Sequence, residues 1–412
     1  MAEIRPFRCI RPSKEAVSEV AALPYDVYNR QEAKEEVEKH PRSFLAIDRA
    51  ETQFDDSVDA YDPRVYERAR QMLEEWLRDG IFQEDPAECC YLYELVMNGR
   101  SQTGIVACAS VDDYQNGVIA RHENTREDKE LDRIRHVDVT GAHTGPIFLA
   151  YRPDAVIGRL MAQIKQEEPL YDFTAEDGVV HRVWRISDAG RIGTLRERFA
   201  AMGRLYIADG HHRAASAVKV GLKRREEKPG YTGDEEFNYF LSVLFPGDQL
   251  MIMPYNRVVR DLNGLDGAEF LRRIGDCFEV TRLGEKPYEP ESRRRIGMYL
   301  DGCWYRLEAK EEILSEDPVR GLDVSLLQDN LLKPVLGIAD PRTDGRIQFV
   351  GGIRGTGELE RLVDGGAAAA FSMYPTSIEE LFAVADAGLL MPPKSTWFEP
   401  KLRSGLFIHR LD

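Results

Sequence analysis

The sequence carries its clearest chemical pattern at one turn. Residues 209–213 read Asp-Gly-His-His-Arg, and the four residues before them, 205–208, are apolar. An apolar run, an Asp-Gly pair and a stretch of small residues predict a buried strand, a tight turn and a helix that begins near His211 and ends at Gly221. A helix start presents unpaired N–H groups and the positive end of the helix dipole, so it favours anions.

Four residues of this turn, 210–213, suit a phosphate ligand. Gly210 lets an oxygen approach the backbone because glycine has no Cβ. His211 and His212 add hydrogen-bond donors, and Arg213 can bind phosphate oxygens in bidentate fashion. Asp209 is a candidate ligand for Mg²⁺ or a candidate base, and His211 is a candidate catalytic residue. The alternative is a common Asp-Gly turn in which Asp209 merely caps the helix. Two of the eight histidines lie in this turn, however, and their presence favours a functional site.

A second polar cluster, Arg-His-Glu-Asn-Thr at 121–125, follows a short apolar strand at 117–120. Glu123 is a candidate general base or metal ligand. His122 and Thr125 are candidate phosphate ligands. The alternative is a polar loop that enters an exposed helix with Thr125 as its cap.

Two further segments are candidates at opposite ends of the chain. Asp26 lies in Pro-Tyr-Asp-Val at 24–27 and can bind a metal or a substrate hydroxyl, although this segment taken alone favours a simple turn at a strand end. The C-terminal segment offers cations and hydroxyls to an anion: Lys394, Ser395, Thr396 and Lys401. A solvated loop is the alternative there. The loop at 140–146 is polar and contains glycine, so it can line a pocket, whereas we expect His136 and His143 to be structural.

Local patterns predict the elements that position these residues. Apolar residues at helical spacing, with Asp62 as the cap and Pro63 at the first position, predict a helix that Asp79-Gly80 ends. Strands at 91–97 and 103–110 form a hairpin with a loop at 98–102. Other expected elements are a mostly exposed helix at 126–139, a mobile loop at 223–236, a strand at 237–246, a helix at 322–336, a strand at 347–352 and a helix after a capping box at 377–380.

Helices and strands alternate irregularly and hairpins are present, which predicts an α+β fold with mixed sheets. We expect three parts. An N-terminal α/β region covers 1–118, a core that contains the strand–DGHHR–helix unit covers 119–260, and a C-terminal α/β region that closes the site covers 261–412.

Composition excludes several classes of partner. With 55 basic and 71 acidic residues the net charge is −16, which disfavours nucleic acid and anionic membranes. No apolar run of about 18 residues predicts a spanning helix, and no secretory segment is expected. The six cysteines lack zinc spacing, so we expect reduced thiols in a cytoplasmic protein. A homodimer is left open.

Five ordered motifs resemble a bacterial and archaeal family of unknown function. They are RPF at 5–7, PYDV at 24–27, RHE-x-T at 121–125, DGHHR at 209–213 and MPxKST-F-PK at 391–401. The family is distantly similar to the ParB/sulfiredoxin superfamily, whose Gly-x-His-Arg turn binds nucleotide phosphates, and to free serine kinases with a similar turn. The resemblance implies a ParB/sulfiredoxin-like core around the strand–DGHHR–helix unit. It also implies a Mg²⁺-dependent kinase that makes O-phosphoserine from free L-serine and ATP or ADP.

The resemblance leaves alternatives open. Sulfiredoxin carries a cysteine where this chain has His211, so sulfinic acid reduction is not expected. A nucleotide-responsive switch without turnover and a metal-dependent phosphohydrolase remain as rival functions. Asp26, Glu123 and Asp209 are unranked as the catalytic carboxylate.

Overall fold

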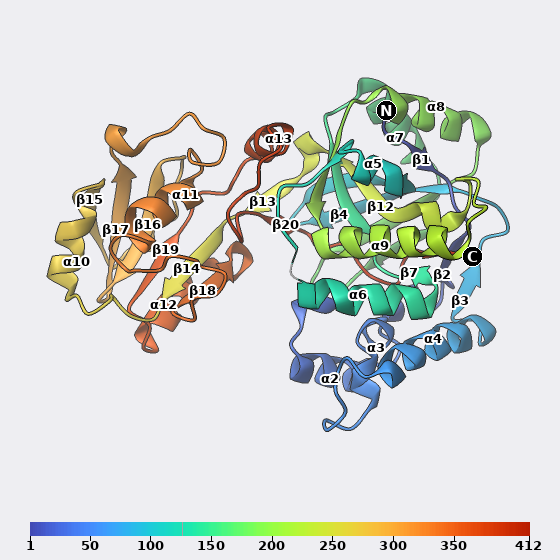
Figure 1. Cartoon of the computed structure of the whole chain (residues 1–412), viewed down its shortest axis with the longest axis horizontal. Helices are drawn as coiled ribbons and strands as arrows, with labels where there is room; N and C mark the ends of the chain where they lie inside the picture. The colour runs from blue at the N-terminus through green and yellow to red at the C-terminus, as the bar shows by residue number, and fades with distance from the viewer. Residues whose placement is uncertain (126) are drawn as a thin grey trace. The chain divides into compact units, whose positions relative to one another are not determined.

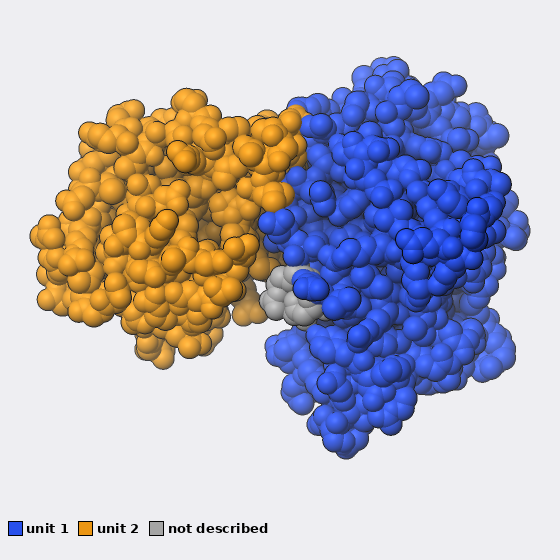
Figure 2. All heavy atoms as spheres, viewed as in Figure 1, with its two compact units in different colours: residues 1–250, 400–412 blue, residues 251–399 orange. Residues whose placement is uncertain are grey.

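The computed structural model describes residues 1–125 and 127–412, which form two compact units (Figure 2). Unit 1 comprises residues 1–250 and 400–412, and unit 2 comprises residues 251–399. This division differs from the three parts expected from the sequence. The segments 1–118 and 119–260 share one sheet, because β5 (Arg100–Ser110) lies between β4 (Cys90–Met97) and β12 (Tyr239–Pro246). The last 13 residues belong with unit 1.

A mixed sheet forms the centre of unit 1, as the α+β prediction requires (Figure 1). Its strand order is β6 (Ile119–Ala120), β11 (Leu205–Asp209), β8 (Ile147–Tyr151), β12, β5, β4, β10 (Val180–Ile186) and β9 (Tyr171–Thr174), with β1 (Ile4–Arg5) paired to β5. The β6–β11 and β8–β12 pairs are parallel, whereas the other pairs of this sheet are antiparallel. Buried side chains such as Leu149, Leu205 and Phe240 form the core against α7 (Ala155–Ile164) and α8 (Ala189–Ala201).

Three helices of unit 1 lie side by side: α9 (His211–Glu227), α6 (Glu127–Thr140) and α4 (Pro63–Arg78) (Figure 1). Because α6 packs against both neighbours, the prediction that the helix at 126–139 is mostly exposed is wrong; residue 126 itself lies outside the described residues. The buried side chains of α6 are mainly polar: Glu130, Arg133, His136, Val137 and Thr140. Its apolar packing involves few of the described residues, such as Ile134 and Val137, so the sequence pattern contains only a narrow apolar stripe.

A small sheet in unit 1 joins segments that are far apart in the sequence. Its order is β3 (Phe82–Glu84), β2 (Cys9–Pro12), β21 (Ile408–Arg410) and β7 (Ala142–His143). β21 therefore separates β2 from β7. Residues 400–412 are held in unit 1 by this pairing.

Local sequence patterns are confirmed at α4 and at the hairpin. Asp62 caps α4 by accepting a hydrogen bond from the Arg64 N–H. The turn of the β4–β5 hairpin is tighter than expected, because Asn98 and Gly99 both adopt positive φ angles of 51° and 77°. Two such residues form the two-residue turn that fits the twist of paired strands, so β5 already begins at Arg100.

Helix α9 continues to Glu227, past the predicted end at Gly221, so the loop expected at 223–236 begins later. Gly221 is needed for close packing instead. A Cβ at this position would lie 2.5 Å from the carbonyl oxygen of Phe237.

Replacing this glycine tests the packing. Gly221→Ala is expected to lower the free energy of unfolding by about 1–3 kcal/mol, because overpacking forces the backbone of Phe237 away from α9. Gly193→Ala in α8 is the matched control, because its Cβ would meet no atom within 4 Å and alanine favours a helix by about 1 kcal/mol. Urea unfolding measures both. Equal stability of the two variants would contradict the argument.

Unit 2 contains an antiparallel sheet and several helices. The sheet order is β15 (Phe278–Gly284), β17 (Cys303–Ala309), β16 (Arg295–Leu300), β19 (Ala369–Ser372), β14 (Tyr255–Val259) and β18 (Ile347–Gly351). β13 (Met251–Met253) pairs with β20 (Trp397–Glu399), and the helices are α10 (Gly267–Ile274), α11 (Asp323–Leu327), α12 (Gly355–Asp364) and α13 (Ile378–Asp386). The predicted capping box of Ser377 and Glu380 is present at α13. Across the described residues, every helix is too short or too polar to cross a membrane.

Candidate active site

The predicted strand–turn–helix unit is present in unit 1. β11 ends at Asp209, Gly210 adopts a left-handed conformation with φ of 88°, and α9 begins at His211. Within the described residues no side chain caps α9, whereas Asp62, Asp154 and Asp188 cap α4, α7 and α8. The first N–H groups of α9 are therefore not bonded to a capping side chain, and such groups suit an anionic ligand.

A carboxylate and an ammonium group flank this helix start. Asp209 Oδ1 accepts a hydrogen bond of 2.7 Å from the Gly210 N–H, and Oδ2 accepts one of 3.2 Å from Lys401 Nζ. Burial alone would raise the pKa of Asp209, but Lys401, Arg213 and the Gly210 N–H together hold that pKa well below its usual range. The Asp209 side chain is 34% exposed, so an ionised carboxylate meets solvent at the turn.

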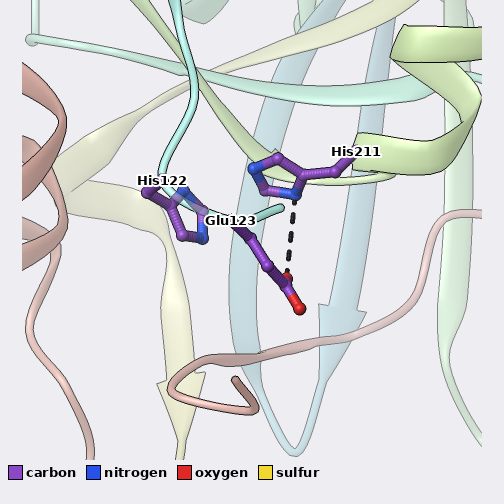
Figure 3. A group of neighbouring side chains, drawn as sticks. All are labelled: His122, Glu123 and His211. Carbon is purple, nitrogen blue, oxygen red and sulfur yellow. Dashed lines mark ion pairs between the residues drawn. The ribbon is translucent and has the colours of Figure 1, made fainter. Parts of the chain in front are cut away.

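Next to this pair lie His122, Glu123 and His211, whose side chains point toward one another (Figure 3). His122 and Glu123 follow β6, and His211 is the first residue of α9. The two imidazole rings meet edge to face with centroids 4.5 Å apart, and Glu123 Oε2 lies 3.9 Å from His211 Nδ1. The structure thus brings the second sequence cluster to the DGHHR turn.

Both histidines of this cluster are neutral. Burial lowers the pKa of His122 to about 4, and the Ile207 carbonyl and the Asp209 carboxylate offset only part of that effect. Burial, with a further contribution from His122, lowers the pKa of His211 well below its usual value. In the described part of the chain, three nitrogens of these rings have no partner in hydrogen-bond geometry. They are both nitrogens of His122 and the Nε2 of His211.

The guanidinium of Arg213 contacts the loop at 144–146. Its Nη1 donates a hydrogen bond of 2.7 Å to the Pro146 carbonyl, and a Cβ on Gly145 would lie 3.4 Å from the same atom. A Cβ on Gly210 would lie 3.2 Å from Arg213 Nε. Arg213 therefore holds the loop at 144–146 against the start of α9, and both glycines make room for it.

This loop lines a small cavity of about 30 Å³, as its composition predicted. The polar residues around the cavity include Tyr25, Arg133, His136, His143, Thr144 and Arg213. Arg133 lies 4.0 Å above the ring of Tyr25, and burial raises the pKa of Tyr25 to about 12. The volume suits one or two water molecules and excludes a nucleotide.

Sequence reasoning missed the long-range partners around the cavity. Thr144 Oγ1 donates a hydrogen bond of 2.9 Å to Asp48 Oδ1. His143 Nδ1 lies 3.2 Å from His409 Nδ1, and His409 Nε2 lies 2.6 Å from Glu236 Oε2. His143 and His409 are 266 positions apart, so no local pattern could have joined them.

The described contacts of several other predicted residues do not involve the cluster. Thr125 donates a hydrogen bond of 2.7 Å to Glu130, which pairs with Lys219. Asp26 lies in a turn, Tyr25–Val27, with its side chain exposed, and no described contact joins it to Glu123 or Asp209. Lys394, Ser395 and Thr396 belong to unit 2, where Ser395 donates to the Pro392 carbonyl. The remaining predicted ligand, His212, lies in the first turn of α9 and accepts a hydrogen bond from Ser216 at its carbonyl.

Comparison with known proteins assigns the chain to a family. Residues 4–325 match the family model described as "Protein of unknown function (DUF1015)". No curated protein matches the chain.

Among solved structures, the chain is similar to a free serine kinase in complex with AMP. The two sequences are 14% identical, and the TM-score is 0.36. The match covers 74% of this chain and 92% of that chain. The same figures hold for a mutant of that kinase in complex with ADP. A conserved hypothetical protein from Pyrococcus furiosus has 14% identity, coverage of 74% and 94%, and a TM-score of 0.36. C-terminally truncated SbnI from Staphylococcus aureus has 12% identity, coverage of 73% and 85%, and a TM-score of 0.39.

Proposed function

The chain belongs to the DUF1015 family, and from this premise we propose that it is a nucleotide-dependent phosphotransferase, with ATP or ADP as donor and free L-serine as acceptor. The proposal includes a ParB/sulfiredoxin-like core around the DGHHR turn, which the motif resemblance favours. The observation that carries it is the uncapped start of α9 behind Gly210, with the Asp209–Lys401 pair beside it.

This arrangement suits the transfer of a phosphoryl group. Phosphate oxygens accept hydrogen bonds from the first N–H groups of α9, and Lys401 and Arg213 compensate their charge. The bond between the terminal phosphorus and its bridging oxygen breaks, so that ADP leaves from ATP or AMP leaves from ADP, while a bond forms between that phosphorus and the serine hydroxyl oxygen. The hydroxyl proton leaves toward a carboxylate, and Asp209 is the candidate because it is ionised and lies at the helix start. Mg²⁺ fits carboxylate oxygens such as those of Asp209, and when bound it supplies further positive charge to the phosphates.

Product formation tests the proposal directly. The full chain, incubated with Mg²⁺, L-serine and ATP or ADP, is expected to yield O-phosphoserine, detected by ³¹P NMR. Lys401→Met should slow the reaction, while Lys39→Met, a change at an exposed lysine of α2 (Arg30–Lys39), should leave the rate unchanged. Nucleotide binding without product would favour the switch, and phosphate release without phosphoserine would favour the phosphohydrolase. Either result would overturn the kinase assignment.

Gly210→Ala is expected to weaken nucleotide binding by about 100-fold or more, because several hydrogen bonds to phosphate depend on the open turn. The new Cβ would crowd the Arg213 guanidinium and a φ of 88° strains alanine. Gly80→Ala is the matched control, because Gly80 also has a positive φ of 76° but no atom within 4 Å of a Cβ. Both should lose similar stability in thermal unfolding, and isothermal titration with ADP should separate them. Unchanged affinity in Gly210→Ala would contradict the proposed phosphate position.

A further inference from the structure

His122, Glu123 and His211 have the donor set of a metal centre. Each offers one atom, and these atoms all lie within 4.8 Å of one another. Two imidazole nitrogens and one carboxylate oxygen are the protein ligands of many catalytic zinc sites, in which further positions stay open. Ligands bound at about 2.0–2.2 Å in a tetrahedral site lie about 3.4 Å apart, so modest side-chain rotations would close the observed separations.

The buried imidazoles are an independent observation that points to a ligand. His122 is 1% exposed and His211 is 6% exposed. Among the described residues, the Nε2 of His211 has no hydrogen-bond partner, and neither nitrogen of His122 has one in good geometry, although the Ile207 carbonyl lies close enough to act on that ring. Buried polar groups are nearly always paired and cost about 1–3 kcal/mol when they are not. A metal ion would satisfy one nitrogen on each ring.

The charges nearby are compatible with a cation. The neutral imidazole is the form that binds metals, and the burial of both rings disfavours their charged form. The Asp209 carboxylate lies close enough to affect both rings and favours positive charge there, whereas Arg121 acts in the opposite direction on His211. The Glu123 carboxylate supplies the negative charge within the ligand set itself.

We propose that His122, Glu123 and His211 bind a divalent transition-metal ion of the Zn²⁺ class, at a site separate from the Mg²⁺ that accompanies the nucleotide. Imidazole nitrogens suit Zn²⁺ and its neighbours in the first transition row, whereas Mg²⁺ prefers oxygen ligands. The site stands on these three side chains alone and does not depend on phosphoryl transfer.

Metal titration of the full chain, without nucleotide, tests the inference. After treatment with a chelator and its removal, the protein is titrated calorimetrically with Zn²⁺, and Co²⁺ serves as a second probe whose visible absorption reports the ligands. Wild type is expected to bind one Zn²⁺ per chain at this site. Glu123→Gln and His211→Ala should weaken that binding by more than the about 10–100-fold that loss of an outer partner costs.

The controls separate this site from chance binding and from unfolding. His40→Ala removes a histidine outside the cluster and should keep the Zn²⁺ affinity and the Co²⁺ spectrum of wild type. Glu123 is 36% exposed, so Glu123→Gln tests the site with little effect on the core. Wild-type affinity in Glu123→Gln and in folded His211→Ala would overturn the inference, as would a wild type that binds no Zn²⁺. Because the assay contains no nucleotide, failure of the kinase assay leaves its outcome unaffected.

Discussion

Lowering the pH from 7 to 5 is expected to destabilise unit 1 by about 4 kcal/mol from two histidines alone. Burial lowers the pKa of His122 to about 4 and that of His181 to about 3, whereas both titrate near 6.5 in the unfolded chain. Between these values the unfolded chain binds protons that the folded chain cannot. Stability is therefore complete above pH 6.5 and falls as the pH approaches 4, and the lowered pKa values of His143 and His211 act in the same direction.

Unit 2 should respond differently to acid. All eight histidines of the sequence lie in unit 1. In unit 2, burial raises the pKa of Asp323 to about 6, so protonation of this carboxyl stabilises the fold as the pH falls. Urea unfolding at pH 7, 6 and 5, with hydrogen exchange followed by mass spectrometry, should show unit 1 losing protection first.

A substitution within unit 1 provides the matched test. His181 stacks on Phe173 with ring centroids 5.1 Å apart, so phenylalanine can occupy the same place. His181→Phe should reduce the pH slope of stability by about one proton, or about 1.4 kcal/mol per pH unit. Stability that is constant from pH 7 to 5, or acid unfolding that begins in unit 2, would refute this account.

Asp209→Asn is expected to lower the kcat of the proposed kinase reaction by about 10²–10⁴-fold. The amide keeps the size of the side chain but carries no negative charge with which to pair with Lys401 or to orient the serine hydroxyl. Because the pKa of Asp209 is held well below its usual range, this carboxylate acts more by orienting the hydroxyl than as a strong base. That role fits phosphoryl transfer, which depends mainly on positioning and charge.

The comparison with the other candidate carboxylates makes this prediction specific. Asp26→Asn changes an exposed side chain and should leave kcat nearly unchanged. For Asp209→Asn, the KM for the nucleotide should change much less than kcat, because the helix N–H groups remain. A normal rate in Asp209→Asn combined with a large loss in Asp26→Asn or Glu123→Gln would assign the role to another residue.

The parts of the fold that could be predicted are those that local sequence determines. The cap and first-position proline of α4, the capping box at α13 and the β11–α9 turn each depend on a few adjacent residues. The burial of α6 could not be predicted, because it depends on α4 and α9 packing on both sides of a polar helix. The role of Gly221 was misassigned for a similar reason, since only the tertiary structure brings Phe237 against it.

The candidate site, too, could be predicted from the sequence only in part. The DGHHR and RHE-x-T clusters were found as chemistry-bearing segments, but the sequence contained no indication that Glu123 lies beside His211. The pairing of Asp209 with Lys401 spans 192 positions and could not be predicted from spacing. His136 and His143 were expected to be structural, and both line the small cavity.

The position of β21 between β2 and β7 has a consequence for biosynthesis. A ribosome delivers residues 251–399 before residues 408–410, so unit 2 can fold while β2 and β7 still lack their shared neighbour. Lys401 emerges in the same late stretch, so until then the nascent chain has only Arg213 of the two cationic side chains that act on Asp209. The synthesis of unit 2 is therefore complete before that of unit 1, and the candidate catalytic centre receives its last residue, Lys401, at the end of translation.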